Sequence, residues 1–516
     1  MSIKEKINIL KEKEKKIHEM GGEQAVSKLT SKGRMTARER LEYFFDQGTF
    51  QEIDKFVTHR CTNFDMKNTE IMADGVITGF GLVSGRTVFA YAQDFTSHAG
   101  TLGEMHAKKI CKIMDLAMKT GAPFIAMNDS GGARIQEGVV ALGGFGDMFF
   151  RNTAASGVIP QIAAIMGPTA GGAVYSPAIM DFVFMVKKSG QMFITGPDVI
   201  KAVTGEEISF EDLGGAVTHS EKSGVCHFAC ENDHETIDSI KTLLSYLPSN
   251  NMEDAPFEAT DDSVFRECPD LDTVIPDSPS TPYDMRDVIT SIVDDARIFE
   301  PLRNFAMNMI ICFARIGGRV VGIVANQPSF LSGCLDIDAS DKAARFIRFC
   351  DAFNIPILTI TDVPGFLPGS NQEWNGIIRH GAKILWSYSE ATVPKILLIT
   401  RKAYGGAYIA MSSKHLGADM VFAWPSAEIA VMGAEGAANI IHRREINGSS
   451  NPSEKRKEKI EEYENLFSNP YEAASIGFVD AVIRPSESRI KIASALAALI
   501  TKTETRPAKK HGNIPL

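Results

Sequence analysis

The sequence lacks the features that mark several large classes of protein. It contains no run of about 20 apolar residues of the kind that spans a bilayer. Its opening, MSIKEKINILKEKEKKIHEM, is charged where a secretory signal would be apolar, so we expect a cytoplasmic protein. No G-x-x-x-x-G-K-[ST] phosphate loop occurs, and Gly79-x-Gly81 lacks the spacing of a dinucleotide fingerprint. ATP or NAD chemistry within the chain is therefore not expected.

Basic residues and paired cysteine motifs are also scarce. The net charge of −10 argues against a nucleic-acid partner, because no extended basic face offsets it. The 8 cysteines form no disulfide framework, and a cytoplasmic compartment would keep them reduced. The only metal-like cluster is Cys226, His227 and Cys230, with His219 and His234 nearby. Because the paired C-x2-C knuckles of a zinc ribbon are missing, we predict a small apolar region there and no metal.

What the sequence does contain is a duplication. A chain of 516 residues with 44% hydrophobic residues is long enough for two globular units. Five landmarks recur at almost one spacing, which is 233 residues for the first three pairs (318 − 85, for example) and 234 for the last two: Gly85 and Gly318, Pro123 and Pro356, Asp129 and Asp362, Pro160 and Pro394, Gly171 and Gly405. The sequence therefore predicts an α/β protein built from two tandem copies of one fold.

Each copy carries the same glycine-rich step after an apolar strand pattern. GPTAGGAVYSPA begins at Gly167, and RKAYGGAYIAM begins at Arg401. Glycine lets the backbone approach a ligand closely, and a helix start adds unpaired N–H donors that attract an anion. A single Ala-Gly-Gly-Ala step would more simply be a turn or a packing contact. Its recurrence in register favours two oxyanion-binding sites.

Other segments bear on domain limits and on cofactor attachment. Residues 247–283 are rich in proline and acidic residues, which is typical of a linker. Residues 446–467 form a polar insertion with no counterpart in the first half, and we expect a loop followed by a charged helix. Ala117-Met118-Lys119 is like the attachment site of a biotin carrier, but its surroundings have helical periodicity. We therefore expect no covalent biotin on this chain.

Several long motifs identify a family. They are GRMTARERLEYFFDQGTF from Gly33, TLGEMHAKK from Thr101, NDSGGARIQEGV from Asn128, ITGPDVIKAVTGEE from Ile194, DVPGFLPG from Asp362 and AEIAVMGAEGAANI from Ala427, together with the two glycine-rich steps. Over almost its whole length the chain resembles the carboxyltransferase subunits of biotin-dependent acyl-CoA carboxylases, decarboxylases and transcarboxylases. The most similar members are the propionyl-CoA carboxylase beta subunit, the methylmalonyl-CoA decarboxylase alpha subunit and the methylmalonyl-CoA transcarboxylase core.

The resemblance implies an architecture and an assembly. It implies tandem crotonase-like domains of ββα superhelical type. Residues 1–262 would be the acyl-CoA domain, 263–283 the linker and 284–516 the biotin domain. A hexamer arranged as a trimer of dimers is implied, with the active site shared between the N-domain of one subunit and the C-domain of another. The implied partners are a biotin carboxyl carrier protein and either a biotin carboxylase or the membrane subunits of a decarboxylase.

The same resemblance assigns a reaction to the two glycine-rich steps. Carboxyl transfer between biotin and an acyl-CoA passes through a thioester enolate and leaves negative charge on the biotin ureido oxygen. Gly171 and Gly172 would hold the thioester oxygen, and Gly406 and Ala407 the biotin oxygen. No side-chain base is implied, because biotin itself can take the α-proton. The cofactor would arrive on the carrier protein, and the coenzyme A thioester would be a substrate.

Further residues are placed near the ligands only by motif match. Gly131, Gly132, Ala133 and Arg134 would border the coenzyme A channel, although a tight turn with a surface arginine is an equal alternative for Arg134. Pro364, Gly365, Phe366 and Tyr404 would line the biotin pocket, although Phe366 could belong to the core and Tyr404 could simply pack beside its glycines.

Substrate and direction are less determined by the sequence. Many propionyl-CoA carboxylases have an aspartate where this chain has Ile409, a position associated with acyl-chain choice. The apolar residue is more like the decarboxylase and transcarboxylase branch. We favour propionyl-CoA and methylmalonyl-CoA, with acetyl-CoA or glutaconyl-CoA as alternatives. The chemistry could run in a carboxylase, in a sodium-pumping decarboxylase or in a transcarboxylase.

Two other functional classes remain as alternatives. A crotonase-type hydratase or hydrolase would need one oxyanion site and two positioned carboxylates, of which Glu137 could be one. A hydratase would have no use for the second glycine-rich step. A non-catalytic scaffold would retain the fold without using either step.

Overall fold

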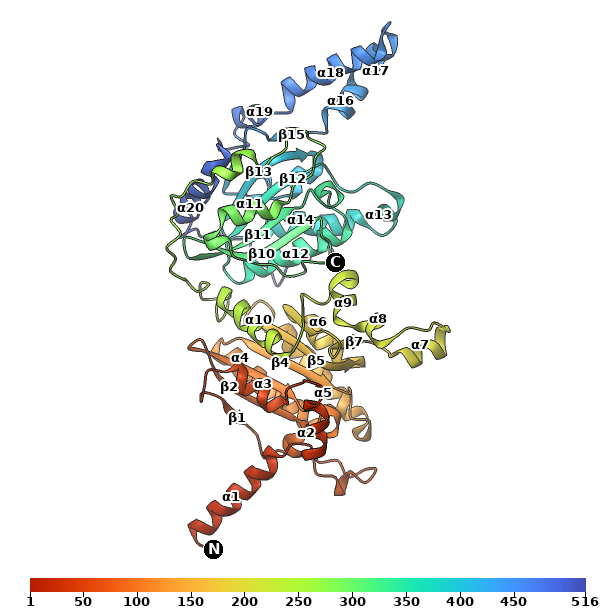
Figure 1. Ribbon diagram of the computed structural model, residues 1–516, viewed down its shortest axis with the longest axis vertical. Coiled ribbons are helices and arrows are strands. Elements are labelled where there is room, and N and C mark those ends of the chain that lie inside the picture. Colours follow the sequence, from red (N-terminus) through yellow and green to blue (C-terminus); the bar gives the residue numbers. More distant parts are fainter. The chain divides into compact units, whose positions relative to one another are not determined.

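The computed structural model describes residues 1–516 and divides into two compact units (Figure 1). The first is Met1–Glu253 and the second is Asp254–Leu516. Each unit is built on one mixed sheet of eight strands with helices packed against it.

The sheet of the first unit has the strand order β1-β2-β3-β4-β5-β6-β8, and β7 pairs with the end of β5. The first three strands pair antiparallel, and the pairs from β3 onward are parallel. The parallel strands β4 and β6 are buried throughout, as their continuous apolar runs predict. The bounds are β1 (Gln51–Ile53), β2 (Val76–Val83), β3 (Arg86–Gln93), β4 (Phe124–Ser130), β5 (Gln161–Ala170), β6 (Phe182–Val186), β7 (Gln191–Phe193) and β8 (Phe228–Cys230).

The helices of the first unit cover this sheet. In α4, Ile110, Ile113, Met114 and Ala117 recur at helical spacing and are buried, and the helix ends at Gly121, whose φ of 64° is left-handed. The bounds are α1 (Ile3–His18), α2 (Glu23–Thr30), α3 (Ala37–Phe44), α4 (Glu104–Thr120), α5 (Val139–Ala155), α6 (Tyr175–Ile179), α7 (Pro197–Thr204), α8 (Phe210–Gly214), α9 (Ala216–Thr218) and α10 (Asp233–Tyr246).

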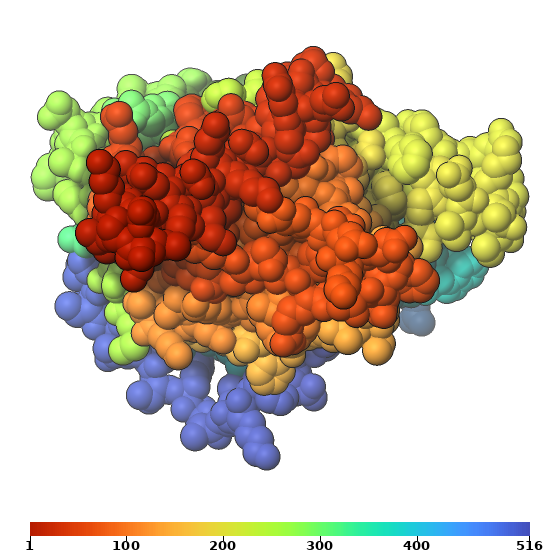
Figure 2. Space-filling model, turned by 90° about the horizontal axis from the view of Figure 1, so that it is seen from below, coloured from red at the N-terminus to blue at the C-terminus, as the bar shows by residue number.

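The N-terminal helix α1 is the least packed of these. Ile3, Ile7 and Leu10 of its predicted apolar stripe are exposed, and only Ile17 is buried. The red N-terminal residues stand at the surface in Figure 2. In the whole structure, no helix is both long enough and apolar enough to cross a membrane.

The second unit repeats the first strand by strand. Its sheet has the order β16-β14-β13-β12-β11-β10-β9, with β15 paired to the end of β13. The bounds are β9 (Ile298–Phe299), β10 (Met309–Ile316), β11 (Arg319–Asn326), β12 (Ile357–Val363), β13 (Lys395–Tyr404), β14 (Met420–Ala423), β15 (Glu428–Ala430) and β16 (Ala481–Val482). Its helices are α11 (Met285–Ile292), α12 (Ile337–Ala352), α13 (Ser370–Trp374), α14 (Ile377–Glu390), α15 (Gly405–Ala410), α16 (Ala434–Ile441), α17 (Arg443–Gly448), α18 (Pro452–Phe467), α19 (Pro470–Ser475) and α20 (Ser488–Ala498).

The predicted duplication is confirmed down to unusual backbone angles. His98, Ala99 and Gly100 all have positive φ, and so do Leu331, Ser332 and Gly333 at the equivalent place. Such runs are rare for residues other than glycine. A Cβ on Gly100 would lie 2.4 Å from the Asp129 carbonyl oxygen, and one on Gly333 would lie 2.6 Å from that of Asp362. Both turns therefore pack against the same landmark aspartate.

Most of the segment predicted as a linker, from Asp254 to Tyr283, is part of the second unit. Cys268 and Leu271 are buried in its hydrophobic core, and the Cys268 N–H donates to the Ser486 carbonyl oxygen at 2.8 Å. The polar insertion at residues 446–467 includes the charged helix α18, as expected.

Two buried lysines also repeat. Lys109 of α4 donates to the carbonyl oxygens of Ala73 and Val76, and Lys342 of α12 donates to those of Leu302, Phe305 and Ala306. Each ammonium therefore holds the segment that connects the first two strands of its own unit. Burial lowers the pKa of Lys109 to about 8 and that of Lys342 to about 7.

These lysines predict a pH dependence of stability. Because each folded-state pKa lies below the ordinary lysine value, the unfolded chain holds more protons than the folded chain up to about pH 10, from about pH 7 for Lys342 and from about pH 8 for Lys109. Each lysine therefore makes stability rise with pH within its own window. We expect denaturant titrations at pH 7, 8 and 9 to show a flatter slope for Lys342→Met than for the wild type. Lys119→Met, an exposed position on α4, is the control. Equal slopes in wild type and Lys342→Met would contradict the assignment.

Candidate active site

The first glycine-rich step is a sharp strand-to-helix turn. The strand β5 ends at Ala170, Gly171 turns the chain with a φ of 62°, and a short 3₁₀ helix η5 (Gly171–Val174) leads into α6. No side chain caps the start of η5. Because the first amides of a helix have no partner within it, the N–H groups at this turn are suited to bind an anion.

The second step repeats this geometry. The strand β13 ends at Tyr404, Gly405 has a φ of 57°, and α15 begins without a side-chain cap. Gly406 and Ala407 are the second and third residues of that helix, where N–H groups lack intrahelical acceptors. Gly406 is exposed, and a Cβ built on it would meet no atom within 4 Å. A ligand can therefore reach this backbone directly.

The two predicted amide pairs are not in the same register. By backbone angle and spacing, Gly171 corresponds to Gly405, so Gly172 corresponds to Gly406 and Ala173 to Ala407. The pair Gly171 and Gly172 thus begins one residue earlier than the pair Gly406 and Ala407. The two sites share a fold but present different amides.

The residues predicted to border the coenzyme A channel follow β4, and the amides of the two glycines are engaged within the turn. The Gly131 N–H donates to the Ala99 carbonyl oxygen at 2.9 Å, and the Gly132 N–H donates to the Ser130 hydroxyl at 3.1 Å. Ala133 forms a bridge with Leu102. These contacts shape the turn and use the Gly131 and Gly132 amides, and the place of these residues beside the channel stays a prediction.

Arg134 is a buried ion-pair centre instead of a surface arginine. Its guanidinium contacts Asp74 at 2.5 Å and Glu137 at 2.9 Å, and it donates to the Thr101 carbonyl oxygen at 2.8 Å. The side chain has no exposed surface. Arg134 therefore acts on this region through the loop that it holds.

The equivalent residues of the second unit follow β12. Phe366 forms with Leu335 the same bridge that Ala133 forms with Leu102. The Phe366 ring packs over Gly381 of α14, where a Cβ would lie 2.8 Å from it. Pro364 and Gly365 are partly exposed beside it.

Tyr404 is tied to the neighbouring strand. Its hydroxyl donates to the Glu428 carboxylate of β15, and burial together with that carboxylate raises the pKa of Tyr404. The carbonyl oxygen of Val431, just after β15, would lie 3.0 Å from a Cβ on Gly405. The Tyr404–Glu428 contact therefore braces the strand that runs beside the second amide site.

Sequence reasoning missed the buried charges beneath the first amide site. Asp129 of β4 is paired with Arg34 and, at 2.9 Å, with Arg40, which also contacts Asp233 at 2.9 Å. Arg34 donates in addition to the Met166 carbonyl oxygen of β5 at 2.9 Å. The GRMTARERLE segment thus fastens the N-terminal arm to β5, which ends at Ala170. The paired arginines of that segment were the available signal.

The second unit neutralises the equivalent aspartate differently. Asp362 accepts from Arg401 Nε at 3.0 Å and from the Lys402 N–H at 3.1 Å. Burial raises the pKa of Asp362, and Arg401 opposes that shift. Arg401 occupies the position equivalent to Gly167, where any Cβ would lie 1.9 Å from Asp129 Oδ1. Gly167 therefore leaves the space that Arg34 fills from elsewhere in the chain.

Comparison with known proteins decides the family. A sequence model of the carboxyl transferase domain matches residues 28–514. The chain is 59% identical over 511 residues, 99% of each protein, to the methylmalonyl-CoA decarboxylase subunit alpha of Propionigenium modestum. It is 57% identical over 516 residues, 100% of each, to the propionyl-CoA carboxylase carboxyltransferase subunit of Haloferax mediterranei.

A solved structure agrees with these relatives. Transcarboxylase 12S, described as a hexamer with methylmalonyl-coenzyme A and methylmalonic acid bound, matches with a TM-score of 0.98 at 53% identity, covering 100% of this chain and 99% of that one. The chain belongs to the carboxyl transferase family. It is an acyl-CoA carboxyltransferase with tandem crotonase-like domains.

Glu137, the carboxylate that a hydratase or hydrolase would use, is not available for catalysis in this carboxyltransferase. Glu137 is almost fully buried, with its carboxylate paired to Arg134 and accepting the Glu104 N–H at 2.6 Å. A general acid or base needs a carboxyl group that can reach a substrate. Glu137 is instead part of the scaffold of the turn.

Only part of the cysteine and histidine cluster is buried in the core of the carboxyltransferase, because His234 is exposed. Cys226 and Cys230 are buried, and burial raises the pKa of the Cys230 thiol to about 11. His227 Nδ1 accepts the Val183 N–H at 3.1 Å. No group of three or more His, Cys, Asp or Glu side chains is placed to hold a metal ion.

Ile409, the predicted specificity position, lies on α15 directly after the second amide site. It is partly buried and packs against the cluster that contains Tyr408 and Val421. Its role in acyl-chain choice stays a prediction.

Proposed function

We propose that the chain moves a carboxyl group between biotin, carried by a separate protein, and the acyl-CoA pair propionyl-CoA and methylmalonyl-CoA. The observation that carries this proposal is the duplicated, uncapped amide turn, because the reaction generates two oxyanions. The names of the relatives at 59% and 57% identity support the same substrate pair. The relatives include carboxylases and decarboxylases at similar identity, so the proposal covers both directions.

Each of the two glycine-rich turns binds one of the two oxyanions. Gly171 and Gly172 hold the thioester oxygen as negative charge develops at the acyl α-carbon, and each donor contributes about 3 to 4 kcal/mol in the transition state. Gly406 and Ala407 hold the ureido oxygen, and the open space over Gly406 fits a flat ring approaching the backbone. Biotin, when bound, supplies the nitrogen that accepts or donates the carboxyl group. Pro364, Gly365, Phe366 and Tyr404 form the walls on that side.

We also propose the assembly and the setting. A hexamer follows from the likeness to the hexameric transcarboxylase 12S core. In that assembly the acyl-CoA domain of one subunit works with the biotin domain of another. A biotin carboxyl carrier protein is the obligatory partner, and a biotin carboxylase or membrane decarboxylase subunits complete the complex. The protein works in the cytoplasm.

Free biotin tests the reaction without the partners. The purified chain is mixed with methylmalonyl-CoA and biotin, and we expect propionyl-CoA to appear at a rate that rises with biotin concentration. Malonyl-CoA and glutaconyl-CoA in parallel rank the acyl chains. Loss of methylmalonyl-CoA that is independent of biotin, or hydration of an enoyl-CoA by the chain alone, would contradict the proposal.

A further inference from the structure

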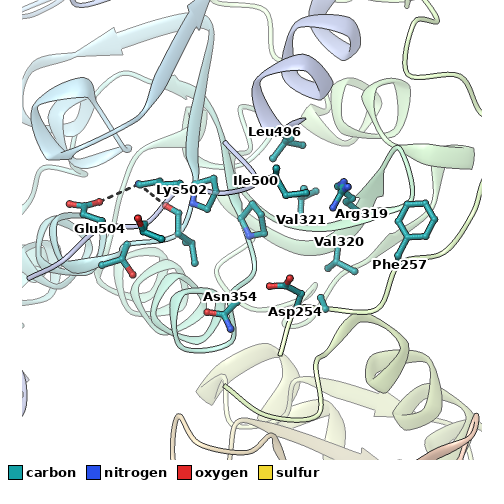
Figure 3. A pocket seen from close by; sticks show the side chains of 16 residues that line it. Asp254, Phe257, Arg319, Val320, Val321, Asn354, Leu496, Ile500, Lys502 and Glu504 are labelled. Atoms are coloured by element: carbon teal, nitrogen blue, oxygen red, sulfur yellow. Dashed lines mark hydrogen bonds and ion pairs between the residues drawn. The ribbon is translucent and has the colours of Figure 1, made fainter. Parts of the chain in front are cut away.

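A pocket of about 360 Å³ opens in the second unit where the strands β11, β12 and β13 begin (Figure 3). Its walls come from the start of β11, from the turns before β12 and β13, from the end of α20 with the following tail, and from residues 254–257. The strand β13 runs 10 residues from this edge to the second amide site, a distance of about 30 Å. The pocket is therefore separate from the proposed active site.

In the first unit, the region equivalent to this pocket is filled by the chain itself. In the first unit, Arg86 donates to the carbonyl oxygens of Leu244 and, at 2.8 Å, of Leu247 at the end of α10. The Asn250 amide then donates to the Gly121 carbonyl oxygen at 2.9 Å, and the Asn251 N–H donates to that of Val158 at 3.0 Å. The chain after α10 thus covers the edge of the first sheet at which its parallel strands begin.

The second unit leaves the same corner open. Arg319, the equivalent of Arg86, makes no hydrogen bond or ion pair through its side chain and lines the pocket. The tail after α20 is held instead by Lys502, which donates to the Val393 carbonyl oxygen at 3.1 Å and contacts Asp419 at 2.8 Å. A guanidinium that is bound in one copy is therefore available in the other.

Two cationic and two anionic side chains line the pocket, and not all of them are paired. Lys502 and Glu504 contact each other at 3.3 Å, and Glu504 also contacts Arg506 at 2.8 Å. Arg319 and Asp254 remain; both are exposed to solvent, and neither side chain has an internal partner. Figure 3 shows the two on different walls, with Val321, Leu496 and Ile500 lying along one side.

We propose that this pocket binds an α-amino acid with an apolar side chain. Arg319 receives the carboxylate, Asp254 receives the ammonium group, and the side chain packs against Leu496, Ile500 and Val321. A ligand with only one charge would pair with only one of these two side chains and would lack the second charge-assisted hydrogen bond. The volume is within the range of small-molecule sites.

Leucine and two analogues that each lack one of its charged groups test the proposal on the full chain. Leucine has both charges, 4-methylpentanoate lacks the ammonium group, and 3-methylbutylamine lacks the carboxylate. In calorimetric titrations we expect leucine to bind up to about fivefold more tightly than either analogue, because an ion pair to a solvent-exposed partner makes only a modest contribution. Equal affinity for 4-methylpentanoate, or no heat with leucine up to millimolar concentrations, would overturn it.

Variants locate the binding. Arg319→Gln and Asp254→Asn should each abolish the preference for leucine and leave carboxyl transfer with free biotin unchanged. Arg297→Gln, an exposed arginine of the same unit outside the pocket, should bind leucine as the wild type does. As a second approach, Ala255→Phe fills the pocket and should weaken leucine binding without unfolding the protein. Leucine binding that survives Arg319→Gln and Ala255→Phe unchanged would place the ligand elsewhere and refute the assignment.

Discussion

Gly406→Ala should leave the protein folded and reduce carboxyl transfer by about a hundredfold or more. The position is exposed, its φ is not left-handed, and the added Cβ would meet no protein atom within 4 Å. Alanine is a better helix former than glycine by up to about 1 kcal/mol, so stability should be equal or higher. The methyl group would, however, occupy the space through which a ligand oxygen reaches the Gly406 and Ala407 amides. Activity with free biotin and thermal unfolding are measured together.

Gly448→Ala is the matched control. Gly448 is an exposed helical glycine of the same unit, its added Cβ would also meet no atom within 4 Å, and the change should alter neither readout. Gly172→Ala is the companion change at the first site, where the nearest atom is Phe145 Cδ2 at 3.5 Å, an ordinary contact. Full activity in Gly406→Ala would show that no ligand approaches that backbone.

Arg40→Met should destabilise the first unit by about 3 to 5 kcal/mol. Arg40 is fully buried and bridges Asp129 and Asp233, so its removal leaves Asp233 without a cationic partner and Asp129 with Arg34 alone. The loss is measured as a shift in the denaturant concentration at which half of the first unit becomes susceptible to proteolysis. We also expect reduced carboxyl transfer in any folded fraction, because Arg34 and Asp129 support the strand that ends at the first amide site.

An exposed ion pair provides the comparison for that variant. Lys16 contacts Glu70 with about half of each side chain exposed, and exposed pairs contribute little. Lys16→Met should leave the unfolding midpoint unchanged. An Arg40→Met protein as stable as Lys16→Met would mean that the buried network is not needed for the fold.

The tandem fold could be predicted because its landmarks depend on local backbone geometry. Gly171 and Gly405 have left-handed φ, and Asp129 and Asp362 support the left-handed turns packed above them. Such positions tolerate few residue types, so they survive in both copies and their spacing is visible in one sequence. The glycine-rich turns were found for the same reason.

What the sequence could not supply were contacts between distant segments. Motif match places Arg134 beside the coenzyme A channel, but only the structure shows that its guanidinium is paired with Asp74. Arg34 and Asp129 are 95 positions apart, and no local periodicity links them. The pocket beside Arg319 exists because the chain after α20 takes another path than the chain after α10, which is a property of packing and not of a motif.

The most direct test of the two-oxyanion account is an experimental structure of the enzyme with methylmalonyl-CoA and free biotin bound together. The account predicts the thioester oxygen within about 3 Å of the Gly171 or Gly172 amide nitrogens, and the biotin ureido oxygen within about 3 Å of those of Gly406 or Ala407. Either oxygen bound away from these amides, with the N–H groups donating to the protein's own carbonyls, would contradict it.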